Sequence, residues 1–294
     1  PVVRLQIGRK PNRRLLRFLC EEMEVNPEDI YETTGLIDYT ALDQIADLDL
    51  PELRFRGWNP VLPPRLSDPD KEIYSGIREG DILEHHPYET FDASVERFIE
   101  EAAVDPQVLG IKQALYRTSG DSPFIPSLIR AAESGKQVAV LVELRARFDE
   151  ARNILWARKL EDAGVHVAYG VVGFKTHTKI ALVVRREIDG LRSYAHISTG
   201  NYNSRTARVY EDVGLLTCDP LICDDVMDLF NAITGRSRQP QYNKLLVAPS
   251  TMKKRFIELI RDKNPAKVKA VMDAMMKMVK LDVAALERAY GSVR

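Results

Sequence analysis

The stretch GKQVAVLVELRARFDEARNILWARKLEDAGVHVAYG, residues 135–170, decides the fold class. Its first part, QVAVLVEL (137–144), is a nearly continuous apolar run of the kind found in strands buried on both faces. ARNILWARKLEDAG (151–164) has apolar residues at helical spacing and ends at a glycine, and VHVAYG (165–170) is another short apolar run. This succession predicts a strand, a crossover helix and a neighbouring parallel strand.

The same alternation continues on both sides of this stretch. The expected helices are FDASVERFIEEAA (91–103), PFIPSLIRAAESGK (123–136) and DDVMDLFNAITG (224–235), and the expected strands are VLGIKQALYR (108–117), KIALVVRRE (179–187) and its hairpin partner LRSYAHISTGN (191–201). Helices between apolar strands indicate an α/β domain with a largely parallel sheet covered on both faces. We expect this domain to span residues 81–250.

The segment before this domain, residues 1–80, has a different pattern. VVRLQI (2–7) suits a strand already under way after Pro1, and NRRLLRFLCEEM (12–23) suits a helix. RGWNPVLPPRLSDPD (56–70) is dense in proline, which is typical of a linker or domain boundary. Residues 1–80 are therefore expected to be a partial α/β region, cut from a longer protein, that ends in a linker.

The segment after the domain, residues 251–294, contains no strand pattern. Its sequence predicts two or three short helices, interrupted at Asn264-Pro265 and again near Leu281. Five of the seven methionines of the chain lie here. Methionines at helical spacing are more often a packing face than a binding site, so we expect a packing role.

Bulk composition limits the partners. The chain has 42 basic and 43 acidic residues, a net charge of -1, so nothing global points to nucleic acid or to a membrane surface. The three cysteines, Cys20, Cys218 and Cys223, show no metal-ligand spacing and suit a reducing compartment. No apolar run approaches the roughly 18 residues of a spanning helix. We expect a cytoplasmic protein whose contact with a membrane is at most peripheral.

The motif GFKTHTKI (173–180) carries a candidate nucleophile. Residues two apart on a strand share a face, so the imidazole of His177 and the ammonium of Lys179 would project together, with Lys175 beside them. A neutral imidazole can attack phosphorus, because its unperturbed pKa near 6.5 leaves it mostly unprotonated at neutral pH. The lysines would neutralise charge on a transferring phosphoryl group. Alone, however, this pair more often marks ordinary surface residues.

A polar turn, STGNYNSRTARVY (198–210), follows the last strand of the expected hairpin. Its Gly200, Asn201 and Asn203 could present backbone N–H groups and side-chain amides to a phosphate. A plain polar turn after a strand is the simpler alternative. By itself this feature does not decide between the two.

Two arginines follow apolar strands: Arg117 in LYRTSGDSP and Arg147 in VELRARFDEARN. Open α/β sheets bind ligands at the carboxyl ends of their strands, and a guanidinium group suits bidentate contact with phosphate oxygens. Asp149 and Glu150 could orient Arg147 or help to hold Mg²⁺. Surface salt bridges and a solvated turn are the alternatives. An imidazole, several cations and an amide-rich turn at one sheet together indicate phosphoryl transfer through a covalent histidine.

Long motifs then resemble a known family. The opening stretch, EGDILEHHPYETF (79–91), DPQVLGIKQALYRTSGDSP (105–123), GVHVAYGVVGFKTHTKIALVVR (164–185) and STGNYNSRTARVYEDVGLLT (198–217) are similar to the central catalytic region of type 1 polyphosphate kinases. The resemblance runs from roughly Val2 to Phe256. It implies a phospholipase-D-like sheet preceded by the latter part of a head domain, because that family shares the HxK signature of phospholipase D.

The resemblance also implies roles. His177 would be a phosphohistidine nucleophile that takes the terminal phosphoryl of ATP and passes it reversibly to polyphosphate, releasing ADP. Arg117 and Arg147 match positions assigned as Mg²⁺ contacts; since guanidinium groups cannot ligate a cation well, we interpret them as holding phosphates that Mg²⁺ bridges. Tyr210 matches a tyrosine assigned to ATP binding, through stacking on adenine. The family also implies a homo-oligomer.

Two departures from the pattern matter. Val184 stands where phospholipase D carries the aspartate of its signature, which favours a kinase over a phosphodiesterase or nuclease that would need a second HxK motif. The resemblance fades after KLLVAPSTMKKRFIELI (244–260), where a further domain normally supplies a second histidine and an arginine. The alternative is therefore a catalytically impaired fragment that binds polyphosphate or a partner subunit. We expect the chain by itself to make polyphosphate poorly.

Overall fold

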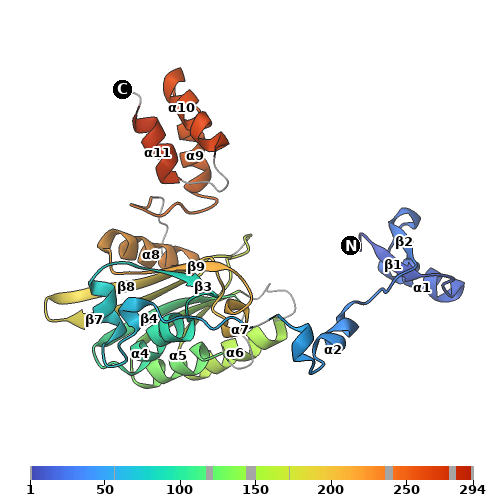
Figure 1. Cartoon of the computed structure of the whole chain (residues 1–294), viewed down its shortest axis with the longest axis horizontal. Helices are drawn as coiled ribbons and strands as arrows, with labels where there is room; N and C mark the ends of the chain where they lie inside the picture. The colour runs from blue at the N-terminus through green and yellow to red at the C-terminus, as the bar shows by residue number, and fades with distance from the viewer. Residues whose placement is uncertain are drawn as a thin grey trace. The chain divides into compact units, whose positions relative to one another are not determined.

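The computed structural model describes residues 2–55, 57–116, 122–143, 150–171, 173–235, 241–277 and 283–292 (Figure 1). The chain divides into two compact units between Gly57 and Trp58. The expected α/β class is confirmed, since the larger unit is built on one mixed sheet with helices on both faces.

The first unit, residues 1–57, is a small strand–helix–strand arrangement. Strand β1 (Leu5–Gly8) pairs in parallel with β2 (Ile30–Thr33), and α1 (Arg13–Met23) connects them. Of its described residues only Val25 is buried, so the unit has almost no core of its own. It also contains α2 (Asp43–Ala46) and 3₁₀ turns at Pro27–Asp29, Thr40–Leu42 and Pro51–Leu53.

The second unit holds a seven-stranded sheet in the order β3-β9-β8-β7-β4-β5-β6. The strands are β3 (Ile82–His86), β4 (Val108–Leu115), β5 (Gln137–Val142), β6 (His166–Tyr169), β7 (Ile180–Glu187), β8 (Gly190–Ser198) and β9 (Asp212–Thr217). The stretch that opened the sequence analysis forms β5, the helix α6 (Glu150–Asp162) and β6, and the two strands are parallel as predicted.

The expectation of a largely parallel sheet is wrong. Strands β4, β5 and β6 are parallel, but β4 with β7, β7 with β8, β8 with β9 and β3 with β9 all pair antiparallel. The tight turn that joins β7 to β8, where Glu187 pairs with Gly190, forces a reversal of direction. Because β4 and β7 are largely buried on both faces, their apolar pattern is the same in either direction.

Helices cover both faces of the sheet, as expected (Figure 1). One core lies under α3, α4, α5 and α6 and contains Ile111, Val140 and Tyr194, while the other lies under α8 and contains Leu141 and Ala195. The remaining helices of this unit are α3 (Ile73–Arg78), α4 (Arg97–Val104) after a π-helical turn at Asp92–Glu96, α5 (Phe124–Glu133), α7 (Ser204–Ala207) and α8 (Pro220–Ile233).

The proline-dense segment is packed against the sheet unit instead of linking two domains. Val61 N donates to Tyr88 O at 2.9 Å, and Thr90 N donates back to Val61 O at the same distance. Leu66, in a 3₁₀ turn at Pro64–Leu66, is buried in the core under α3. The structure therefore places the unit boundary at Gly57, earlier than the residue 80 expected from the prolines.

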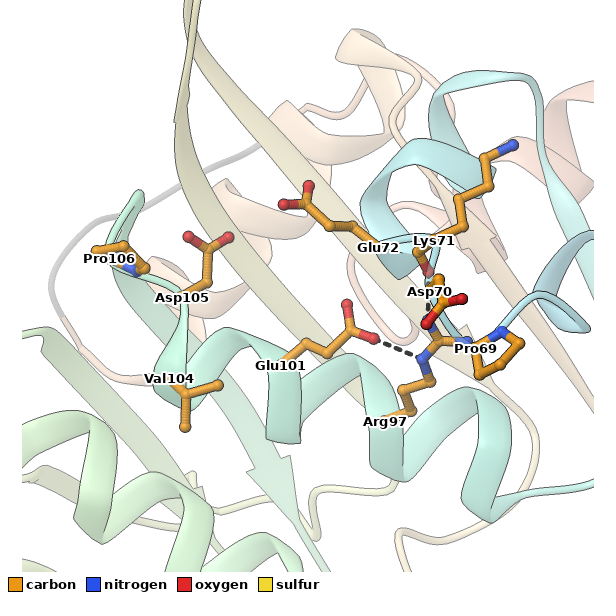
Figure 2. Close-up of a pocket in the computed structure, with 9 residues that line it drawn as sticks. All are labelled: Pro69, Asp70, Lys71, Glu72, Arg97, Glu101, Val104, Asp105 and Pro106. Carbon is orange, nitrogen blue, oxygen red and sulfur yellow. Dashed lines mark hydrogen bonds and ion pairs between the residues drawn. The ribbon is translucent and has the colours of Figure 1, made fainter.

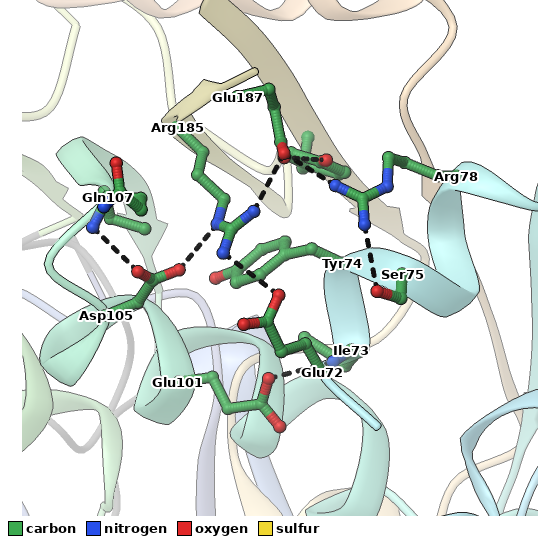
Figure 3. Close-up of polar contacts among 12 residues, drawn as sticks. Glu72, Ile73, Tyr74, Ser75, Arg78, Glu101, Asp105, Gln107, Arg185 and Glu187 are labelled. Carbon is green, nitrogen blue, oxygen red and sulfur yellow. Dashed lines mark hydrogen bonds and ion pairs between the residues drawn. The ribbon is translucent and has the colours of Figure 1, made fainter. Parts of the chain in front are cut away.

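An ion-pair network ties α3 and α4 to β7 (Figure 3). The guanidinium of Arg185, in β7, contacts Asp105 at 2.6 Å, Glu187 at 2.9 Å and Glu72 at 3.0 Å. Glu187 is also bound by Arg78 of α3 at 2.6 Å. Because Arg185, Asp105 and Glu187 are all largely removed from solvent, each charge depends on the others for compensation.

The last described elements are three helices, α9 (Met252–Ile260), α10 (Pro265–Met276) and α11 (Val283–Gly291), as the sequence predicted. They share a small core of Leu259, Val271 and Leu286, against which Met275 packs. Met272 and Met276 are exposed, so the expected methionine packing face is only partly present. No helix in the described ranges of the chain is both long and apolar enough to cross a membrane.

Candidate functional site

The His177 motif lies in the connection just before β7. Strand β7 begins at Ile180, so the expectation that His177 and Lys179 sit on the strand is wrong by a few residues. Their predicted juxtaposition is nevertheless present, because Lys179 Nζ lies 3.0 Å from His177 Nδ1 and donates to the His177 carbonyl at 2.7 Å. Lys179 is buried, whereas the ring of His177 is exposed.

Tyr116, directly after β4, forms a platform for this motif. Its ring meets the His177 ring edge to face, with centroids 5.4 Å apart. Lys175 Nζ and Lys179 Nζ lie 5.4 and 5.3 Å from the centre of the same ring. Since β4 and β7 are adjacent and antiparallel, the end of one strand meets the start of the other. The sequence analysis passed over Tyr116, although its place beside Arg117 at a strand end was a usable signal.

The electrostatics suit a neutral imidazole next to a cation. Partial burial, followed by the charges of Lys179 and Lys175, lowers the pKa of His177 below its usual 6.5. Burial also lowers the pKa of Lys179 to about 8, against an opposing pull from Asp212. At neutral pH, His177 therefore keeps a lone pair on one ring nitrogen while Lys179 is mostly an ammonium group.

Two buried side chains that the sequence analysis missed hold the motif in place. The carboxylate of Glu143, after β5, accepts the backbone N–H of Thr176 at 2.7 Å, immediately before His177. Asn153 of α6 donates to the carbonyls of Tyr116 and Glu143 at 3.2 and 3.1 Å, and so joins the ends of β4 and β5. The sequence signal that could have identified Glu143 was a carboxylate at the end of a strongly apolar strand.

Replacing Glu143 by alanine is expected to lower the free energy of unfolding by about 1–3 kcal/mol, because the buried N–H of Thr176 loses its acceptor. Glu143→Gln should cost less, since its amide oxygen can still accept that bond. Urea unfolding followed by circular dichroism measures both. Glu133→Ala, at an exposed carboxylate, is the matched control and should change stability by less than about 0.5 kcal/mol. Equal losses in Glu143→Ala and the control would contradict the assignment.

The predicted polar turn begins beside Lys179. Ser198 N, at the end of β8, donates to the Lys179 carbonyl at 3.0 Å. Asn203 caps α7, because its Oδ1 accepts the N–H groups of Arg205 and Thr206, both at 3.0 Å. The side-chain oxygen of Asn203 is therefore already hydrogen-bonded to the start of α7. Asn201 Oδ1 is buried without a hydrogen-bond partner in the structure.

The structure describes some of the other predicted site residues. The ring of Tyr210 is 60% exposed and therefore open to stacking. Lys175 is also exposed. Arg117, Arg147 and Asp149 lie outside the described residues. In the parts of the chain that are described, no group of three or more His, Cys, Asp or Glu side chains is arranged to hold a metal ion.

A hollow of about 370 Å³ lies elsewhere (Figure 2). It is lined by Pro69, Asp70, Lys71, Glu72, Arg97, Glu101, Val104, Asp105 and Pro106. Carboxylates outnumber cations in this lining, and Arg97 is already bound by Glu101 at 2.5 Å, which does not suit a phosphate. Pro106 precedes β4 whereas Tyr116 follows it, so the hollow and His177 lie at opposite ends of that strand. The hollow is not part of the His177 site.

The family model for the polyphosphate kinase C-terminal domain 1 matches residues 72–239. The chain belongs to the polyphosphate kinase family. A polyphosphate kinase from Mycobacterium avium is 51% identical over 285 residues, and one from Mycobacterium marinum is 55% identical over 260 residues. These alignments cover 94% and 88% of this chain but 39% and 35% of the two relatives, so the chain spans under half of their length.

A solved polyphosphate kinase shows the same architecture. The crystal structure of polyphosphate kinase from Porphyromonas gingivalis is 30% identical, with a TM-score of 0.71 over 97% of this chain and 44% of that chain. The family expected from the sequence motifs is therefore confirmed, and the match spans both units of this polyphosphate kinase chain.

Proposed function

We propose that this chain carries the phosphoryl-transfer core of an ATP:polyphosphate phosphotransferase, in which His177 is the nucleophile. The observation that carries the proposal is the exposed His177 ring, 3.0 Å from Lys179 Nζ and edge to face with Tyr116, in a member of the polyphosphate kinase family. The homologues named polyphosphate kinase supply the substrate class, ATP and polyphosphate.

The reaction can be written with these groups. A lone pair on His177 attacks the terminal phosphorus of ATP, an N–P bond forms, and the bond from that phosphorus to the bridging oxygen breaks so that ADP leaves with the electron pair. A terminal oxygen of polyphosphate then attacks the same phosphorus and the imidazole leaves. Lys179 and Lys175 would offset the charge on the equatorial oxygens. Each step is reversible.

Mg²⁺ is the cofactor we propose. The described site offers ammonium groups and an imidazole, whereas Mg²⁺ prefers oxygen ligands, so substrate phosphates would be its main ligands. Arg117 and Arg147 would hold those phosphates. When bound, the ion neutralises the phosphate oxygens of ATP.

The turn and Tyr210 complete the proposed binding surface. The amide groups of Asn201 and Asn203 and the turn's backbone would contact phosphate, with the Asn203 oxygen reserved for α7. The exposed Tyr210 ring would stack on adenine. Self-association, a cytoplasmic location and a membrane contact that is at most peripheral stay predictions.

Incubation of the purified chain with γ-labelled ATP tests the proposal. We expect covalent label that is lost in acid and kept in base, as a phosphoramidate requires, and that is chased by ADP or by polyphosphate. Polyphosphate binding without any label would instead favour the alternative of an impaired, polyphosphate-binding fragment. Label stable in acid would place the phosphoryl group on a hydroxyl and exclude His177 as its acceptor.

A further inference from the structure

A buried polar group lies inside the sheet unit, apart from the residues assigned above. Glu84, His86, His196 and Tyr202 are each at most 2% exposed, and the buried Ser94 also acts on Glu84. Glu84 and His86 come from the edge strand β3, His196 from β8, and Tyr202 from the turn after β8. An isolated buried carboxylate is costly, so Glu84 needs compensation from its neighbours.

Gly214 allows Glu84 to reach His196 across a whole strand. Glu84 pairs with Gly214 in β9, and Gly214 pairs in turn with Ser198 in β8. A Cβ added at Gly214 would lie 2.8 Å from His196 Nε2 and 3.0 Å from Glu84 Oε2. The first distance is shorter than real Cβ atoms show and the second is tighter than most of them, so the two side chains fill the space that a larger residue would occupy.

His196 connects Glu84 to Tyr202. Its Nε2 faces Glu84 Oε2 at 3.5 Å, an electrostatic contact in which neither atom has a hydrogen-bond partner in the structure, and its Nδ1 lies 2.9 Å from the Tyr202 hydroxyl. A carboxylate can only accept, so its charge favours a proton on Nε2. In the tautomer with that single proton, Nδ1 accepts the O–H of Tyr202. Charge on Glu84 thereby favours the tautomer that receives Tyr202.

His86 supplies the compensating charge. Its Nδ1 lies 3.0 Å from the Glu89 carbonyl, which can only accept, and its Nε2 faces Glu84 Oε2 at 3.8 Å. The separation from Glu84 is too long for a hydrogen bond, so geometry requires only the proton on Nδ1. Burial is the largest effect on the pKa of His86 and lowers it, but Glu84 and the Glu89 carbonyl together raise it, which favours the imidazolium form. Burial likewise raises the pKa of Glu84, but His196, His86 and Ser94 together lower it to about 2.

Tyr202 links the buried polar group to the candidate site. It lies between Asn201 and Asn203, and its ring packs edge to face on Phe124 at 5.4 Å. The turn it anchors starts at Ser198, which is hydrogen-bonded to Lys179. We propose that Glu84 is a positioning residue, which acts through the His196 imidazole and the Tyr202 hydroxyl to fix the turn of residues 198–203 beside His177. Its effect on phosphoryl transfer rests on the proposed function, whereas its effect on the turn does not.

Three variants of the full chain test this relay: Glu84→Met, which removes the acceptor, Tyr202→Phe and the double variant. Each single variant should lower the initial rate of labelling by γ-labelled ATP about 10- to 100-fold, since small displacements of a binding group have effects of this size. The double variant should be no slower than the slower single one, because both changes break the same chain of contacts. Glu211→Gln removes an exposed carboxylate 3.0 Å from His85 and is the matched control, with labelling unchanged.

A spectroscopic measurement distinguishes a role of Glu84 in positioning the turn from a role in stability alone, and it does not require enzymatic activity. In ¹⁵N spectra, His196 should show a protonated Nε2 in the wild type. Glu84→Met leaves no acceptor at this place, so the proportion of that tautomer should fall, with shifts in the amide signals of Asn201 and Asn203. Wild-type labelling rates in Glu84→Met, or rate losses that multiply in the double variant, would overturn the proposal. If the wild type takes no label, the proposed function fails, and unchanged Asn201 and Asn203 signals would then overturn the relay separately. Should Glu84→Met not fold, Tyr202→Phe keeps the ring and supplies the same readouts.

Discussion

Replacing His177 by glutamine is expected to abolish the acid-labile label from γ-labelled ATP, to below about 10⁻³ of the wild-type rate, because glutamine has no ring nitrogen with which to form the covalent bond. Glutamine fills a similar volume, and His177 is exposed, so the fold should be unchanged. His166→Gln, at an exposed histidine of β6, is the control and should label normally. Normal labelling of His177→Gln would place the nucleophile elsewhere.

The labelling rate should also follow a bell-shaped pH profile. The imidazole must be neutral, and burial together with Lys179 and Lys175 lowers the pKa of His177, so the acid limb lies below the usual 6.5. The ammonium of Lys179 is lost as the pH rises through its pKa of about 8, which sets the alkaline limb. Lys179→Met should shift the acid limb towards higher pH, since it removes one of the charges that lower the pKa of His177. An unshifted acid limb would contradict this coupling.

The largest loss of stability is expected from Arg185→Met, at about 3–5 kcal/mol in the free energy of unfolding. Removal of the guanidinium leaves the carboxylates of Asp105 and Glu187 mostly buried without their main cation. Urea unfolding measures the loss, and Arg192→Met is the control. Arg192 forms an exposed pair with Asp189, so its removal should cost less than about 1 kcal/mol.

A double variant identifies the cause. Arg185→Met combined with Glu187→Gln should lose less stability than the two single losses added together, because one of the two stranded charges is gone. Strict additivity would show that Arg185 acts through packing on the Tyr74 ring, whose centre lies 5.5 Å from its guanidinium carbon, and not through charge.

Local patterns were enough to predict most elements of the sheet unit. The stretch of residues 135–170 contains one parallel connection in full, so its strand, helix and strand were read correctly. The hairpin of β7 and β8 was also predicted correctly. The antiparallel pairing of β7 with β4 could not be read, because both strands are apolar whether their neighbours are parallel or antiparallel. The polar residues buried in strands, such as Glu84 and Arg185, were also missed. Their partners lie far along the chain, and only the tertiary fold brings them together.

For the candidate site, the sequence predicted the contact between His177 and Lys179, which needs only a local extended chain. The support from Tyr116, Glu143 and Asn153 could not be predicted with certainty, since it depends on which strand ends become neighbours. Asn203 shows a further limit. The same residue type serves phosphate contacts and helix caps, and only the structure reveals the cap on α7.

The position of β3 at the edge of the sheet has a consequence during synthesis. Its partner is the last strand, β9, so that Ile82 pairs with Leu216. On the ribosome, β3 therefore emerges long before any strand can pair with it, and Glu84 and His86 remain hydrated until β8 and β9 follow. Such long-range pairing is slow, and meanwhile the unpaired strand edge can pair with other chains and aggregate. The carboxylate and the two histidines on this strand would keep that edge soluble during the wait, before Glu84 and His86 become buried in the folded protein.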